Sequence, residues 1–163
     1  YKIIKGYIPR DEAIAISNRF RVDAIADKYG DTSNGFVNGA IDKVDHPELS
    51  AIAFEKVSYL NELLGIKVLP SYTFTRIYTE DSVLPRHADR SPCEVSLTIH
   101  LDGDKEWAFG IEDADGNDVE VLLEPGDAIL YDAPNAEHWS CLFDTSYAAA
   151  APVRLDSGGR RIL

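Results

Sequence analysis

The hydrophobic pattern changes near Lys67, and this change constrains the fold more than any other feature of the sequence. Before it, apolar residues recur at helical spacing; after it, short stretches rich in β-branched and aromatic residues alternate with turn sequences. Two helices followed by many short strands predict a mainly β fold, a sandwich or barrel with helices buttressing one face. We predict strands at residues 72–78, 94–101, 107–111, 119–123 and 127–131, weaker strands near 139–143 and 160–163, and hairpin turns at 102–104 and 115–117.

Two helices are predicted in the first 66 residues. The first spans residues 11–29, with Asp11 as its candidate cap. The second spans residues 47–64, where Asp45 has capping-box spacing and Gly65 ends the apolar stripe. The polar segment between the two helices is rich in glycine and asparagine and predicts a loop.

Length and charge narrow the class of protein. The 163 residues suffice for one domain, with helical support in residues 1–66 and a barrel in 67–163. A net charge of −12 disfavours nucleic acid or an anionic membrane as a partner, because both bind basic surfaces. There is no apolar run of about 18 residues and no secretory signal. Two cysteines without a CxxC pattern favour a reducing, cytoplasmic location. The oligomeric state is not indicated.

The segment Leu84–Asp89 contains the main candidate for chemistry, His87-Ala88-Asp89. A His and an Asp two residues apart on an extended segment project to the same side. They can then share one metal ion, and a further His from elsewhere completes the facial triad of non-haem iron(II) oxygenases. The third ligand proposed here is His138, for which the alternative is a loop histidine packed beside Trp139.

A second His-x-Asp sequence, His100-Leu101-Asp102, competes with the first. It lies where a strand ends, and its aspartate suits the predicted turn at 102–104. The pair His87 and Asp89 instead lies between loops at the end of a strand, which suits a metal at a barrel opening. The first pair is therefore the favoured ligand pair.

The ordered set of motifs resembles the 2-oxoglutarate- and iron(II)-dependent dioxygenases, in particular the prolyl 4-hydroxylase-like branch. The resemblance covers about residues 67–163 and implies a double-stranded β-helix, or jelly roll, buttressed by two helices. It implies His87, Asp89 and His138 as iron ligands. It is carried by Arg76-Ile77-Tyr78, His87-x-Asp89, His100-Leu101-Asp102, Pro125-Gly126-Asp127-Ala128-Ile129-Leu130-Tyr131 and His138.

The resemblance also implies a cosubstrate site. Tyr78 matches a tyrosine that hydrogen-bonds 2-oxoglutarate, and His100 falls where relatives have an aromatic hydroxyl; a satisfied strand-end histidine is the alternative. A guanidinium suits the distal carboxylate. Alanines occupy the expected distance after His138. The candidate anchors are therefore Arg160 first, Arg154 second and Arg161 third, against the alternative of surface arginines.

The implied activity is hydroxylation of an unactivated C–H, because the carboxylate of Asp89 fills the position that a halide takes in a halogenase. The resemblance implies Fe(II), 2-oxoglutarate and O2, with ascorbate as a further candidate. A prolyl, peptidyl or amino-acid-like substrate is expected, chosen by acidic loops at 30–46, 79–86 and 144–158. The alternatives are a small-molecule, natural-product oxygenase and a non-enzymatic, cupin-like metal-binding barrel.

Overall fold

A computed structural model describes residues 1–26, 37–80, 82–90, 93–142 and 153–158. Within these residues the helices are α1 (Arg10–Ile25), α2 (Pro47–Glu55) and α3 (Val57–Leu64). None of the described helices is long and apolar enough to cross a membrane. The strands are β1 (Lys2–Ile4), β2 (Ile41–Val44), β3 (Tyr72–Ile77), β4 (Leu84–His87), β5 (Val95–Asp102), β6 (Trp107–Glu112), β7 (Asp118–Leu122), β8 (Ala128–Asp132), β9 (His138–Leu142) and β10 (Val153–Gly158).

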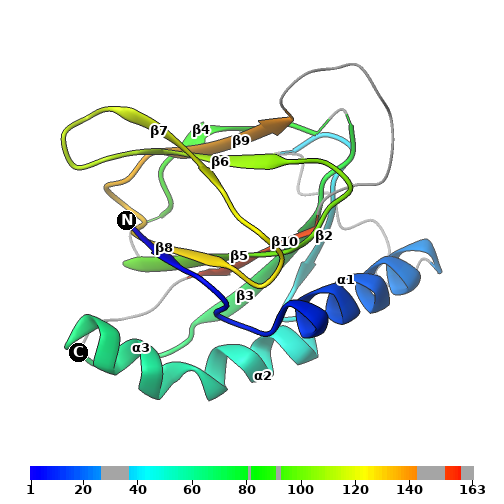
Figure 1. The fold of residues 1–163 in the computed structure, drawn as a ribbon, viewed down its shortest axis with the longest axis horizontal. Helices are drawn as coiled ribbons and strands as arrows, with labels where there is room; N and C mark the ends of the chain where they lie inside the picture. The colour runs from blue at the N-terminus through cyan, green and yellow to red at the C-terminus, as the bar shows by residue number, and fades with distance from the viewer. Residues whose placement is uncertain (27–36, 81, 91–92, 143–152, 159–163) are drawn as a thin grey trace.

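Two antiparallel sheets face each other (Figure 1). The larger has the strand order β1-β8-β5-β10-β3-β2, and the smaller has the order β4-β9-β6-β7. From β3 onward the chain passes repeatedly between the sheets: β3, β5, β8 and β10 lie in the larger one, and β4, β6, β7 and β9 in the smaller. This winding is the double-stranded β-helix predicted from the sequence.

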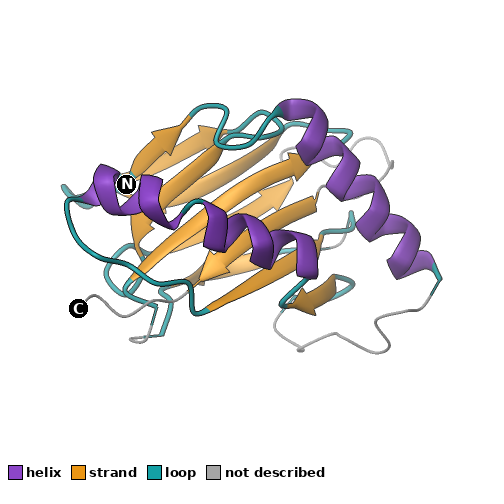
Figure 2. Ribbon diagram, turned by 90° about the horizontal axis from the view of Figure 1, so that it is seen from below, coloured by secondary structure: helices purple, strands orange, loops and turns teal. Residues whose placement is uncertain are grey.

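The helices cover the outer face of the larger sheet (Figure 2). Ile16 and Phe20 of α1 share one buried apolar cluster with Leu97 and Ile99 of β5. Side chains alternate along a strand, so the intervening residues of β5 face the space between the sheets. These residues are polar and buried: Ser96, Thr98 and His100.

The helix boundaries differ from the prediction at the caps. Pro9 is the N-cap of α1 and Asp11 lies in the first turn without a capping hydrogen bond, so the predicted Asp11 cap is wrong. The predicted helix 47–64 is two helices, because the chain breaks at Lys56. Asp45 does not cap α2; its carboxylate accepts a hydrogen bond from the Thr73 backbone N–H at 2.9 Å instead.

Four strands differ from the prediction. Strand β2 lies in the predicted loop, β1 and β4 were not predicted, and β10 ends before the predicted strand at 160–163, which lies outside the described residues. The 102–104 turn joins the two sheets rather than forming a hairpin, since β5 and β6 belong to different sheets. The 115–117 turn does join the hairpin β6–β7, with Gly116 at φ +80°.

Asp127 fixes the N-terminal strand to the barrel, and its replacement gives a pH-dependent prediction. Its buried carboxylate accepts hydrogen bonds from Lys5 Nζ (2.6 Å) and from the backbone of Gly6 (2.9 Å) and Glu124 (3.0 Å). Burial raises the pKa of Asp127, but these donors outweigh burial and the net pKa is lowered. The stabilisation is therefore present above the unfolded-state pKa of about 3.9 and lost as pH falls through the lower folded-state pKa.

We expect Asp127→Asn to lower the free energy of unfolding by about 1–3 kcal/mol at neutral pH. The loss should shrink below pH 3, where the wild-type carboxyl is also protonated. Denaturant unfolding at both pH values measures it, with Asp115→Asn, at an exposed turn position, as the control. An equal loss at both pH values would contradict a charge-dependent role.

Candidate metal centre

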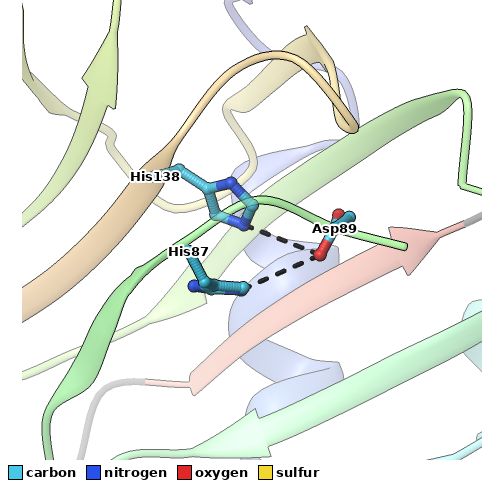
Figure 3. A group of neighbouring side chains, drawn as sticks. All are labelled: His87, Asp89 and His138. Atoms are coloured by element: carbon cyan, nitrogen blue, oxygen red, sulfur yellow. Dashed lines mark ion pairs between the residues drawn. The ribbon is translucent and has the colours of Figure 1, made fainter. Parts of the chain in front are cut away.

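His87, Asp89 and His138 converge at one place between the sheets (Figure 3). One possible ligand atom from each residue lies within 4.8 Å of the others. An oxygen of Asp89 lies 3.8 Å from Nε2 of His87 and 3.8 Å from Nε2 of His138. Metal–ligand bonds of about 2.1 Å allow two ligand atoms of one ion to be up to about 4.2 Å apart. Both His–Asp separations satisfy that limit.

Strand pairing brings the two histidines together. His87 ends β4 and His138 begins β9, and the two are direct partners in the β4–β9 ladder. Leu84 and His87 are three residues apart, and in a regular strand their side chains would point to opposite faces. A register shift between them interrupts the ladder, so that Leu84 and His87 lie on the same face. The next residues reach Asp89, whose backbone N–H donates to the carbonyl of Ala133 at 3.0 Å.

Both imidazole rings are oriented by the backbone two residues earlier. Nδ1 of His87 donates to the carbonyl of Pro85 at 2.8 Å, and Nδ1 of His138 donates to the carbonyl of Ala136 at 3.1 Å. A carbonyl only accepts, so the proton lies on Nδ1 in both rings. Nε2 is then unprotonated in both rings and lies 3.8 Å from the Asp89 carboxylate in each case, and this is the tautomer that a metal requires.

Further side chains hold the three candidates in place. Ser96 donates to the Asp89 carboxylate at 2.8 Å. The hydroxyl of Tyr131 lies 3.4 Å from Nε2 of His138 and 3.3 Å from the Thr98 hydroxyl. The ring of Phe109 stacks on His138, with the centroids 5.6 Å apart. His138 is only 2% exposed, so this side of the centre is closed to solvent.

The guanidinium of Arg86, in β4, forms ion pairs with carboxylates on and beside the other strands of the smaller sheet. Arg86 bonds Glu112, Asp118 and Glu137, and its charge lies 4.5 Å from the centre of the Trp139 ring. The hydrogen bond to Glu137 is the largest cause of the raised pKa of Arg86, followed by that to Asp118. Arg86 precedes His87 and Glu137 precedes His138 in the chain, so this contact joins the backbones that carry both histidines.

In the larger sheet, four charged or polar residues occupy consecutive backbone partner positions across neighbouring strands. Asp42, Arg76, Arg154 and His100 are consecutive partners across β2, β3, β10 and β5. Arg76 and Asp42 form a buried ion pair at 2.6 Å, and both side chains are 4% exposed. Burial lowers the pKa of Arg76, but the hydrogen bond with Asp42 opposes this and the net pKa is raised. Asp42, expected on an acidic loop, is therefore an interior residue.

Three of the residues predicted to bind the cosubstrate lie among the described residues: Tyr78, His100 and Arg154. Tyr78 is buried beside Trp107, with ring centroids 4.9 Å apart. His100 is buried on the interior face of β5, and the structure does not place it in the cluster of His87, Asp89 and His138. Arg154 occupies the backbone position between Arg76 and His100. Arg160 and Arg161 lie outside the described residues.

Sequence reasoning missed several of these contacts. Ser96 lies in the predicted strand at 94–101, and alternation along that strand could have suggested its bond to Asp89. Tyr131 ends the Pro125–Tyr131 motif, but the sequence pattern assigned it no role. Arg86 carries no local signal, because its importance depends on partners far along the chain.

No protein-family model and no curated protein sequence matches this chain. Solved structures do match its fold. A prolyl-4-hydroxylase from Pseudomonas putida superposes with a TM-score of 0.69 at 14% identity, covering 98% of this chain and 92% of that one. HygX from Streptomyces hygroscopicus, with nickel, 2-oxoglutarate and hygromycin B bound, gives 0.65 at 13% identity, covering 96% and 81%. The viral collagen prolyl hydroxylase of Paramecium Bursaria Chlorella virus-1 gives 0.62 at 12% identity, covering 98% and 94%.

The fold of this chain is thus the double-stranded β-helix found in 2-oxoglutarate- and iron(II)-dependent oxygenases, including prolyl 4-hydroxylases. The predicted fold class and the resemblance are confirmed at the level of fold. The candidate metal centre of the chain itself has two imidazole nitrogens and one carboxylate, the donor set of a facial triad.

Proposed function

We propose that this protein is a 2-oxoglutarate- and iron(II)-dependent dioxygenase that hydroxylates an unactivated C–H bond. The observation that carries the proposal is the convergence of His87, Asp89 and His138, with both Nε2 atoms facing one carboxylate. Two imidazoles and a carboxylate with further positions open suit non-haem iron(II) better than a closed structural zinc site. HygX, which has the same fold, holds nickel and 2-oxoglutarate in its crystal structure.

The residues of the chain have separate roles in this proposal. His87, Asp89 and His138 hold the iron. Bound iron with 2-oxoglutarate and O2 would supply the oxidising chemistry, in which the cosubstrate is decarboxylated to succinate. The backbone carbonyls behind the two imidazoles fix their tautomers, and Ser96 holds the Asp89 carboxylate. The buried rings of Phe109 and Tyr131 exclude water from the inner side of the centre.

For the cosubstrate we propose Arg154 as the anchor of the distal carboxylate. Its backbone position is paired with that of His100, whereas its other neighbour Arg76 already binds Asp42. A guanidinium binds a carboxylate through two parallel hydrogen bonds. Tyr78 is proposed to donate a further hydrogen bond. Arg160, preferred from the sequence, remains the alternative anchor.

We propose a prolyl, peptidyl or amino-acid-like substrate. Two of the solved structures compared above are prolyl hydroxylases. The exposed acid Asp132 lies at the start of the loop that leads to His138, and the net charge is −12. A basic peptide would be attracted to such a rim and a nucleic-acid backbone repelled. The second candidate is a small-molecule oxygenase, favoured by the hygromycin B complex of HygX.

The function is tested by succinate release. With Fe(II), 2-oxoglutarate and O2, we expect slow succinate formation that Asp89→Ala abolishes. Proline-containing peptides should stimulate it, more strongly at low salt if the acidic rim steers a basic peptide. Free amino acids, aminoglycosides and methylated oligonucleotides serve as comparisons. Stimulation by oligonucleotides alone would refute the substrate class, and no succinate under any condition would favour the non-enzymatic metal-binding barrel.

A further inference from the structure

Ser140 has a buried hydroxyl that no described group satisfies. It lies in the middle of β9 and is 0% exposed. Its Oγ has no hydrogen-bond partner among the residues that the structure describes. A buried hydroxyl without a partner costs free energy, so such groups in folded proteins are rare and need an explanation.

The strand register shows where this hydroxyl points. Ser140 is two residues beyond His138 on the same strand, so both side chains lie on the same face of the smaller sheet. Its direct partners on the neighbouring strands are Leu84 of β4 and Phe109 of β6. Phe109 contacts His138 inside the barrel, so the hydroxyl also faces the interior. Both strand partners are apolar and give the hydroxyl nothing to bond.

The spacing suits a ligand that extends inward from the metal. Two residues along a strand cover about 6.6 Å. The carbon chain of 2-oxoglutarate has four C–C bonds of about 1.5 Å and spans about 5 Å when extended. A molecule bound to the metal through its oxo-acid end therefore places its distal carboxylate near the level of Ser140. A carboxylate accepts hydrogen bonds and matches a hydroxyl donor.

We propose that the Ser140 hydroxyl donates a hydrogen bond to the distal carboxylate of 2-oxoglutarate and so selects a five-carbon dicarboxylate as cosubstrate. This inference rests on the proposed function. Ser140 belongs to the smaller sheet, whereas Arg154, the proposed anchor of the distal carboxylate, belongs to the larger sheet. The hydroxyl is held ready for the ligand by a rigid strand with no competing partner among the described residues.

The test is an anaerobic titration of 2-oxoglutarate into the Fe(II)-loaded protein, in which absorbance or heat is recorded after each addition. Ser140→Ala should weaken 2-oxoglutarate binding by about tenfold to a hundredfold, as expected for one hydrogen bond to a charged group. Iron affinity should change by less than about twofold, because the Ser140 hydroxyl forms no hydrogen bond with His87, Asp89 or His138. The melting temperature without ligand should be unchanged or higher, because the variant removes an unsatisfied hydroxyl.

Thr75→Val is the matched control. Thr75 has the other buried strand hydroxyl without a described partner, but it lies on the face of β3 opposite to Arg76. Its loss should leave 2-oxoglutarate affinity unchanged. Titration with 2-oxobutyrate, which lacks the distal carboxylate, should show the same affinity for the wild type and Ser140→Ala.

The outcomes separate the role of Ser140 from the proposed function. If the wild type binds 2-oxoglutarate and Ser140→Ala binds it equally well, the role of Ser140 is refuted and the proposed function stands. If Ser140→Ala weakens 2-oxobutyrate as much as 2-oxoglutarate, the hydroxyl does not bind the distal carboxylate and the inference is also wrong. If the iron-loaded wild type binds no 2-oxoglutarate, the proposed function itself fails.

Discussion

Iron(II) binding should be lost when His87, Asp89 or His138 is replaced with alanine, and kept when His100 is replaced. Each of the three provides one donor atom of a three-residue centre, so the loss should exceed the roughly 10–100-fold drop typical for a partner outside the ligand set. Anaerobic Fe(II) titration measures it, with Co(II) absorbance as a second readout of coordination. Circular dichroism confirms that each variant is folded.

His100→Ala is the matched control, because His100 is also a buried interior histidine followed two residues later by an aspartate. Its backbone N–H donates to the carbonyl of Asp127, a contact that alanine retains. Loss of iron in His100→Ala together with retention in His87→Ala would reverse the choice between the two His-x-Asp sequences.

The second large effect concerns the cosubstrate. Arg154→Ala should raise the dissociation constant of 2-oxoglutarate at least a hundredfold and leave iron affinity nearly unchanged. Removing one partner of a buried charged pair typically costs about 3–5 kcal/mol, because the other charge stays buried. Arg154→Lys should recover part of the loss, since an ammonium keeps the charge but not the paired hydrogen bonds.

Arg160→Ala tests the rival anchor in the same titration. We expect it to bind 2-oxoglutarate like the wild type. The reverse pattern, with Arg160→Ala defective and Arg154→Ala normal, would show that the cation comes from beyond the described end of β10.

The sequence predicted those parts of the fold in which buried and exposed, or apolar and polar, residues alternate with the period of a helix or a strand. The alternation along β5 separates Leu97 and Ile99, against the helices, from Ser96 and Thr98 inside the barrel. The spacing of His87 and Asp89 likewise predicted two side chains that meet on one side. In both cases the information lies within a few residues of sequence.

The parts that sequence reasoning missed depend on distant partners. Strand β10 contains Asp156, Ser157 and Gly158, residue types that are rare in isolated strands, yet it pairs with β3 on one side and β5 on the other. Asp42 was expected on an exposed loop because it is charged. It is buried because Arg76, 34 residues away, neutralises it, and no local pattern reports such a contact.

The hydrogen bonds that orient the two imidazoles determine which amino-acid substitutions can disturb the candidate metal centre. Each ring takes its alignment from a backbone carbonyl two residues earlier in the chain, Pro85 for His87 and Ala136 for His138. The oxygen that sets each tautomer belongs to the main chain, so no side-chain substitution removes it. The loops around the opening can therefore diverge and admit a new substrate while the metal centre keeps its alignment, which makes the scaffold a ready starting point for redirecting the oxidation by loop exchange.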